Sequence, residues 1–302
     1  MSIYVEIRIR GTMDELWRLT QTPDLHVRWD LRFTDIEYLP RPDDTEPQRF
    51  LYATRIGFGL SIQGKGETVG EHDGANGERT SALKFWSDDP MSLIREGAGY
   101  WRYVPTSDGQ RFFTSYDYRV RFGALGRFFD AIVFRPLIGW ATAWSFDRLR
   151  LWIEKGIDPV SSLQRSLIHL IARISLAFVW LYQGLIPKLL HRQADELIMI
   201  QQGGVSETMG PLVVQVIGWA EIVLGLVMLF WFYQRWPFIL TIVLMIGATA
   251  GVVINSPQFL VRAFNPASLN VLMVALAAVG LLACRDLPSA RRCVRHGPKA
   301  ET

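Results

Sequence analysis

Apolar and polar side chains alternate along much of the first half of the chain. Residues 3–9 read IYVEIRI, in which every second residue is aliphatic. Six further strand-like segments follow: 33–39, 49–56, 58–69, 79–86, 91–104 and 111–121. Turn sequences such as RPDD, EHDGANGE and TSDGQ separate them. Because a period of two is typical of strands with one buried face, the first half is predicted to be rich in β-structure.

Helical patterns flank these strands. Thr12, with Glu15 three residues later, has the form of a capping box, and Pro23 divides the stretch that follows into two short helices. Residues 125–155 are rich in Phe, Trp, Leu and Ile and predict one long helix. Pro136 lies within it and is expected to kink or interrupt it, because proline cannot donate the backbone hydrogen bond.

The second half of the chain contains four long apolar runs. A helix needs about 20 apolar residues to cross a bilayer. The runs 166–187, 211–233, 236–254 and 266–284 meet this requirement. We therefore expect an α+β domain over 1–157, an all-α bundle of four transmembrane helices over 163–286, and a basic tail over 287–302.

Lysine and arginine residues near the ends of these runs predict the orientation in the membrane. One side carries Arg148, Arg150, Lys155, Arg165, Arg235, Arg285, Arg291, Arg292, Arg295 and Lys299. The other side carries only Lys188, Arg192 and Arg262. Because positive residues accumulate on the cytoplasmic side, both termini are expected in the cytoplasm and the protein in the inner (plasma) membrane. The alternating N-terminus has no signal-peptide pattern, which agrees with this orientation.

Overall charge and cysteine content exclude other classes. The net charge of +3 is small for a nucleic-acid-binding protein, so no nucleic-acid partner is expected. The two cysteines, Cys284 and Cys293, do not form a CxxC pair, so neither a structural disulfide nor a thiolate metal site is predicted.

One carboxylate interrupts the second apolar run. Glu221 lies about 15 Å along the helix from its start, near the middle of the membrane. A charged group at this depth must face the bundle interior and find a partner, or be protonated. One face of the first run carries a stripe of residues at steps of three and four: His169, Arg173, Ala177, Trp180, Gly184 and Lys188. Arg173 is the favoured partner of Glu221, because it lies roughly 10 Å from the cytoplasmic end of its helix and its long side chain can reach the middle of the membrane.

The alternative is that these groups only lock helix packing. Gln215 is part of that interpretation. The sequence GATAG at 247–251 is predicted to provide a small-residue face for close helix packing in the same way.

The membrane half resembles a known family. RISLAFVWLYQGLIPKLL at 173–190, followed by GWAEIVLG at 218–225, is similar to the DoxX-like family of four-helix membrane proteins. Members of the wider family are linked to quinone-coupled sulfur oxidation and to membrane redox complexes. The resemblance implies a four-helix bundle. A quinone site needs only an apolar slot with one or two polar groups, which His169, Arg173, Gln183 and Glu221 are able to provide. His169 is the only histidine within a run, so a bis-histidine haem is not expected.

The first half resembles a second family. Its order of one strand, two short helices, six strands and a long helix, with GAGYWRYVPTSDGQRFFTSYDYRV at 97–120, is similar to the helix-grip fold of the SRPBCC (START-like) superfamily. The resemblance implies a curved antiparallel sheet whose long helix closes an apolar cavity. Members include lipid carriers, quinone-binding proteins, cyclases and hydrolases. The candidate lining residues are Phe85, Trp101, Phe128, Phe129, Ile132, Trp140 and Trp144.

No catalytic constellation is apparent. His26, Asp30 and Asp35 are close in sequence, but the predicted helices and strand point them in different directions. There is no nucleophile elbow, zinc motif or phosphate loop.

We therefore expect a membrane protein that binds a quinone or lipid without covalent cofactors, with its bundle as a membrane site or a docking platform for a redox partner. A homo-oligomer, a quinone-linked or cyclase-type enzyme and an assembly subunit without its own ligand are the alternatives.

Overall fold

The computed structural model describes residues 2–297 except 42, 44–45, 58 and 75. The chain forms two compact units. The first comprises residues up to Ser162 and the segment from Pro288 onward, and the second comprises Leu163–Leu287. The C-terminal segment that we expected to be a separate tail therefore belongs to the first unit.

Seven antiparallel strands form the sheet of the first unit, in the order β1-β7-β6-β5-β4-β3-β2. Their bounds are β1 Ile3–Ile9, β2 Asp35–Tyr38, β3 Arg49–Gly57, β4 Leu60–Asp73, β5 Arg79–Trp86, β6 Ile94–Thr106 and β7 Gly109–Val120. Irregular pairing in β3–β4, β4–β5 and β6–β7 marks bulges, which bend and twist a sheet. The expected order of elements and the antiparallel pairing are confirmed.

Helices accompany this sheet in the predicted places. Their bounds are α1 Met13–Gln21, α2 Pro23–Trp29, α3 Gly123–Phe129, a π-helical turn Asp130–Phe134 and α4 Arg135–Lys155. Thr12 caps α1 by accepting a hydrogen bond from the backbone N–H of Glu15. The long helix runs on through the π turn, and Pro136 follows that turn at the start of α4. The π turn is the irregularity that the proline led us to expect, because proline cannot donate the hydrogen bond of a regular helix.

The C-terminal half of α4 is buried on all sides. Asp147, fully buried, accepts hydrogen bonds from Arg150 at 2.7 Å and from the backbone N–H of Ser289 at 2.8 Å. Val294 pairs with Glu6 of β1 through two backbone hydrogen bonds of 2.9 Å. The segment 288–297 is thus held against α4 and β1.

Two charges that we counted among the membrane flanks have a different role. Arg148 is buried and donates to the carbonyl oxygens of Arg28, Trp29 and Pro159. Arg150 is buried between Asp147 and Glu154. Because both guanidinium groups are used inside the first unit, neither is available to lipid headgroups.

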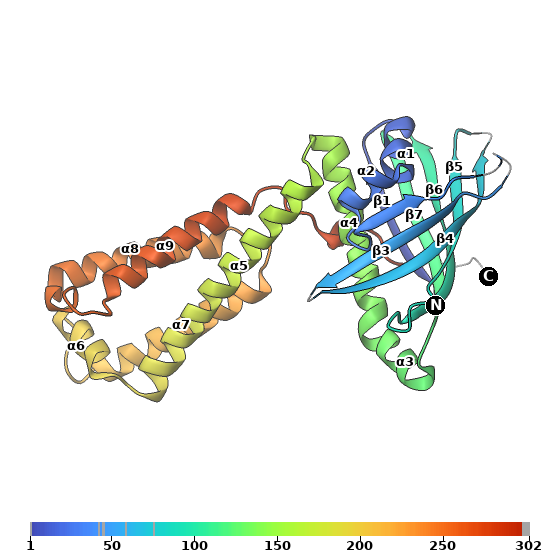
Figure 1. Ribbon diagram of the computed structural model, residues 1–302. Coiled ribbons are helices and arrows are strands. Elements are labelled where there is room, and N and C mark those ends of the chain that lie inside the picture. The colour runs from blue at the N-terminus through green and yellow to red at the C-terminus, as the bar shows by residue number, and fades with distance from the viewer. Residues whose placement is uncertain (1, 42, 44–45, 58, 75, 298–302) are drawn as a thin grey trace, which may run out of the picture. The chain divides into compact units, whose positions relative to one another are not determined.

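The second unit contains the apolar helices (Figure 1). Their bounds are α5 Pro159–Gln183 with a π-helical extension Gly184–Leu190, α6 Ala194–Gln202, α7 Gly210–Phe230, α8 Trp236–Asn255 and α9 Pro266–Ala283. Four of them are long and apolar enough to cross a membrane, as predicted. The short helix α6 lies between the first two apolar runs, where the sequence pattern predicts no element.

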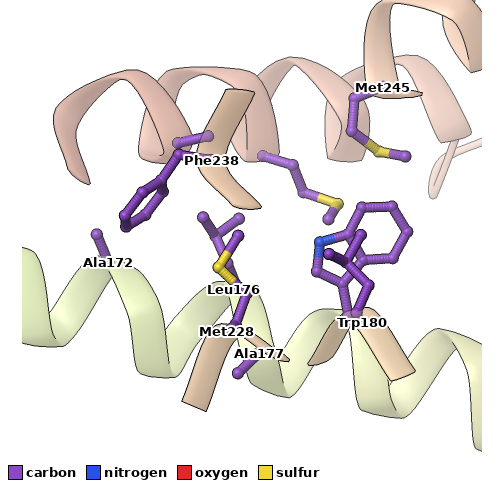
Figure 2. Close-up of a cluster of buried hydrophobic side chains, with 10 residues drawn as sticks. Ala172, Leu176, Ala177, Trp180, Met228, Phe238 and Met245 are labelled. Carbon is purple, nitrogen blue, oxygen red and sulfur yellow. The ribbon is translucent and has the colours of Figure 1, made fainter. Parts of the chain in front are cut away.

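Side chains from all four long helices form the core of this unit. Figure 2 shows Leu176 and Trp180 of α5 facing Phe238 and Met245 of α8, with Met228 of α7 among them. Met273 and Ala277 of α9 belong to the same cluster. The predicted stripe on α5 is confirmed, since His169, Arg173, Ala177, Trp180, Gly184 and Lys188 are all buried.

Candidate functional site

The inner face of the sheet is lined with aromatic rings that lie over glycines. A side chain at Gly64 would collide with the ring of Tyr52, and one at Gly66 would collide with the ring of Phe50. Gly97 lies under Phe85 in the same way. We call Phe50, Tyr52 and Phe85, with the three glycines beneath them, the aromatic floor. Its three rings are only half-buried.

The other end of the same face is tightly packed. Trp29 of α2, Tyr103 of β6, Phe112 of β7 and Phe146 of α4 are fully buried, and the rings of Phe112 and Phe146 stack at 4.5 Å. The helices therefore cover the sheet beside β1, β7 and β6. The rings on β3 and β5 keep part of their surface exposed.

The predicted cavity-lining residues fall into two groups by burial. Trp101 and Trp144 belong to the buried core, and Phe85 lies in the aromatic floor. The remaining predicted lining residues, Phe128, Phe129, Ile132 and Trp140, are all exposed. They lie on α3, the π turn and the first part of α4, whose sequence is apolar on more than one face, so hydrophobicity alone did not show which side turns inward.

A buried polar cluster borders the aromatic floor. His26 and Asp30 are one turn apart at the end of α2, and His26 Nε2 lies 3.1 Å from Asp30 Oδ2. Arg32 donates to both carboxylate oxygens, through Nε at 2.9 Å and through Nη2 at 2.6 Å. Asp30 is fully buried. The structure thus joins two residues that we expected to point apart, whereas Asp35 is exposed.

Aromatic rings connect this cluster with the floor. The ring of His26 stacks on Trp29 and meets Trp101 edge-on, both at 4.9 Å. It also meets Phe33 at 5.3 Å, and Phe33 meets Tyr52 at 5.6 Å. A ligand resting on the floor would therefore have a histidine and an arginine side chain at its border.

Burial controls the protonation of this cluster. Burial lowers the pKa of His26, and the hydrogen bond and charge of Asp30 only partly oppose it. Burial alone would raise the pKa of Asp30, but the charge of Arg32 and the hydrogen bonds from His26 and Arg32 hold it well below its usual range. Neutral His26 beside ionised Asp30 is the favoured state.

Acidification is expected to destabilise the protein through His26. An unfolded histidine has a pKa of about 6.5, so below that pH the unfolded chain takes up a proton that the buried ring does not. Between pH 7.5 and pH 5.5 the free energy of unfolding should fall by about 1 kcal/mol. Asp30 stays ionised over this range and does not contribute to the change. The measurement is the unfolding midpoint of the detergent-purified protein at pH 7.5 and pH 5.5.

Two variants isolate this effect. His26→Gln should have a smaller difference between the two midpoints, whereas His72→Gln, at an exposed position of β4, should keep the wild-type difference. Equal pH dependence in wild type and His26→Gln would show that His26 titrates as an ordinary exposed histidine.

In the membrane half, Arg173 and His169 form one polar group. Arg173 is 1% exposed and donates from Nη1 to the carbonyl oxygen of Met228 at 2.7 Å and from Nη2 to that of Gln234. Its Nε donates to His169 Nε2 at 3.0 Å. These carbonyls belong to the last turn of α7 and the turn after it, where helical oxygens have no partner of their own. Arg173 therefore caps α7.

Glu221 belongs to a different polar group, which corrects the predicted pair. Its Oε2 lies 3.1 Å from Lys188 Nζ, and the same ammonium lies 3.3 Å from Oε1 of Glu196 on α6. Gln183 and Gln215 are half-buried, and no side-chain hydrogen bond joins them to either group among the described residues.

Two glycines explain why Lys188 pairs with Glu221. A Cβ at Gly184 would lie 2.5 Å from the carbonyl oxygen of Gly218, so the backbones of α7 and the end of α5 touch here. Lys188 is one turn beyond Gly184, and Glu221 is nearly one turn beyond Gly218. The close crossing brings the ammonium and the carboxylate together.

In contrast, Gly247 and Gly251 of α8 have nothing within 4 Å of an added Cβ, so the predicted packing role of GATAG is wrong within this chain.

The first unit has two open clefts, and both contain charged residues. One, of about 470 Å³, is lined by charged residues that include Asp35, Glu37, Lys65, Asp88 and Asp89. The other, of about 620 Å³, lies beside β1 and includes Arg8, Arg10, Arg150, Glu154 and Arg292. Among the residues that the structure describes, no three His, Cys, Asp or Glu side chains gather as a metal site.

Solved structures similar to the chain are distant. A STAR-related lipid transfer protein from Xanthomonas axonopodis is 16% identical, with a TM-score of 0.38, over 51% of this chain and 86% of that one. The ZhuI aromatase/cyclase from Streptomyces sp. R1128 is 12% identical, with a TM-score of 0.37, over 52% of this chain and 97% of that one. Likeness at this level carries no argument about ligand or reaction.

Similarity in sequence is much closer. The model of the DoxX-like family matches residues 177–278. The uncharacterized membrane protein YndG of Bacillus subtilis (strain 168) is 49% identical over 183 residues, which cover 60% of this chain and 68% of that protein. The chain therefore belongs to the same family as the membrane protein YndG, with a DoxX-like domain in its membrane half.

Proposed function

We propose that this membrane protein binds a hydrophobic small molecule, a lipid or a quinone, on the aromatic floor of its first unit. The observation that carries this proposal is the half-exposed state of Phe50, Tyr52 and Phe85, on a sheet face whose other end is fully packed. Binding sites for small ligands are mostly apolar, with a few polar groups that fix orientation. His26 and Arg32, at the border of the floor, are suited to hold the polar end of such a ligand.

The membrane half then acts as the anchor that keeps this site beside the bilayer. Arg173 and His169 bind backbone carbonyl oxygens, and Lys188 forms ion pairs with Glu221 and Glu196. Most polar groups of the bundle are thus already paired, which favours the floor over the bundle as the binding site.

The test is mass spectrometry of lipids and quinones extracted from the full-length protein purified in mild detergent. Phe50→Glu places a carboxylate on the floor, and Leu51→Glu places the same group on the opposite face of the same strand. Since an apolar ligand cannot solvate a charge, one molecule enriched in wild type should be lost in Phe50→Glu and kept in Leu51→Glu.

The variant Glu221→Gln separates the floor from the bundle. Enrichment that persists in Glu221→Gln supports the floor as the site. Enrichment lost in Glu221→Gln but kept in Phe50→Glu would move the site into the bundle. No enrichment in wild type would contradict the carrier role.

A further inference from the structure

A continuous stretch of the first unit exposes an unusual density of large apolar side chains. Leu125 is 76% exposed, Phe128 66% and Ile132 59%. We define the α3–α4 face by the exposed apolar residues of this stretch: Phe122, Leu125, Phe128, Phe129, Ile132, Val133, Leu137 and Trp140. Soluble proteins rarely expose apolar residues at this density unless the surface has a partner.

The face is held in a fixed position. Asp130, buried within the π turn, accepts a hydrogen bond from the hydroxyl of Tyr118 at 2.6 Å and one from Arg135 Nε at 3.0 Å. The guanidinium of Arg135 lies 4.6 Å from the centre of the Tyr118 ring. Because these bonds tie the π turn to β7, the exposed rings sit on an ordered support.

Charge around the face favours an anionic partner. The stretch 117–140 contains four arginines, Arg119, Arg121, Arg127 and Arg135, against two acids, Asp117 and Asp130. Arg135 forms ion pairs with both acids, and the stretch keeps a net charge of +2. Arg127 is exposed between Leu125 and Phe128. Aromatic and aliphatic residues beside arginine are typical of helices that lie in the boundary between headgroups and acyl chains.

The chain itself brings a bilayer within reach of the face. The four apolar helices are long enough to cross a membrane, and the first, α5, begins at Pro159. α4 begins within the α3–α4 face and ends at Lys155, so only three residues separate it from α5. α4 has 21 residues and is therefore about 30 Å long. Because α4 is joined directly to a membrane-spanning helix, the α3–α4 face stays at a high effective concentration near lipid.

We propose that the α3–α4 face inserts its apolar side chains into the surface of an anionic lipid bilayer. The first unit is then attached to the membrane at two places, through α5 and through this face. The inference goes beyond the proposed function and does not depend on a ligand at the aromatic floor. It also accounts for the exposure of Phe128, Phe129, Ile132 and Trp140.

The test uses nitroxide labels on the full chain in nanodiscs of phosphatidylcholine and phosphatidylglycerol. Cys284 and Cys293 are first replaced by alanine. Single cysteines are then introduced by Leu125→Cys, by Phe128→Cys and, as a matched control, by Val69→Cys at a position of β4 that is 53% exposed. Collision rates with oxygen, which enters lipid, and with a nickel chelate, which stays in water, are measured by power saturation.

Labels at Leu125 and Phe128 should collide mainly with oxygen, whereas the label at Val69 should collide mainly with nickel. Nickel access at Leu125 and Phe128 equal to that at Val69 would overturn the proposal. Labels shielded from both reagents, with dipolar coupling between two protomers, would instead assign the face to a second copy of this chain and would also overturn it.

Discussion

Replacing Gly184 with leucine is expected to destabilise the membrane half by about 3 kcal/mol. The first carbon of any side chain there would lie 2.5 Å from the carbonyl oxygen of Gly218, which is backbone and cannot move aside alone. α5 and α7 must separate, and Lys188 then loses its contact with Glu221. The measurement is unfolding of the purified protein in mixed detergent micelles with increasing SDS.

Gly247→Leu is the matched control. It places the same side chain on another apolar helix, at a position with nothing within 4 Å of an added Cβ. Removing a helical glycine should leave stability unchanged or raise it by up to about 1 kcal/mol. An equal loss at both positions would show that Gly247 also packs closely, for example between two copies of the chain.

The partner of Glu221 depends on the Gly184–Gly218 crossing, which was not predictable from the sequence. The stripe of buried residues on α5 was predictable, because a helix repeats its faces every three to four residues. That stripe offers Glu221 two basic partners, Arg173 and Lys188, and depth along the helices favoured Arg173. The choice depends on the point at which α5 and α7 cross, which only the packed structure determines.

Backbone carbonyl oxygens, and not a carboxylate, are the partners of Arg173. The last turn of α7 and the turn before α8 present carbonyl oxygens that no helical N–H can reach. An arginine has five donors and can satisfy several of them at once. The sequence does show that a tight turn follows α7, so this alternative was available.

In the first unit, the alternating pattern predicted the strands well, because each strand has one buried face. The pairing of His26 with Asp30 was missed, although a spacing of four residues at a short helix is itself a signal of proximity. The direction of Phe128 and Ile132 was not predictable in the same way. Apolar residues on several sides of a helix do not show which side meets protein and which meets another partner.

Replacing Arg173 with leucine is expected to destabilise the membrane half by about 3–5 kcal/mol. The change leaves the carbonyl oxygens of Met228 and Gln234 and the Nε2 atom of His169 without their donor, in a site that is 1% exposed. The turn between α7 and α8 should loosen first. The measurements are SDS-induced unfolding and hydrogen exchange of the backbone amides of residues 228–236.

Arg165→Leu removes the same charge from an exposed position of the same helix and should change stability by less than about 0.5 kcal/mol. Arg173→Lys keeps a positive charge but offers three donors on a shorter, non-planar head, so it should restore only part of the loss. If Arg173→Leu were as stable as wild type and lost a co-purifying molecule, the arginine would be a ligand-binding group. If Arg173 caps α7, the opposite is expected. In Arg173→Leu, hydrogen exchange of the backbone amides rises across the α7–α8 turn, and any molecule held on the aromatic floor is retained.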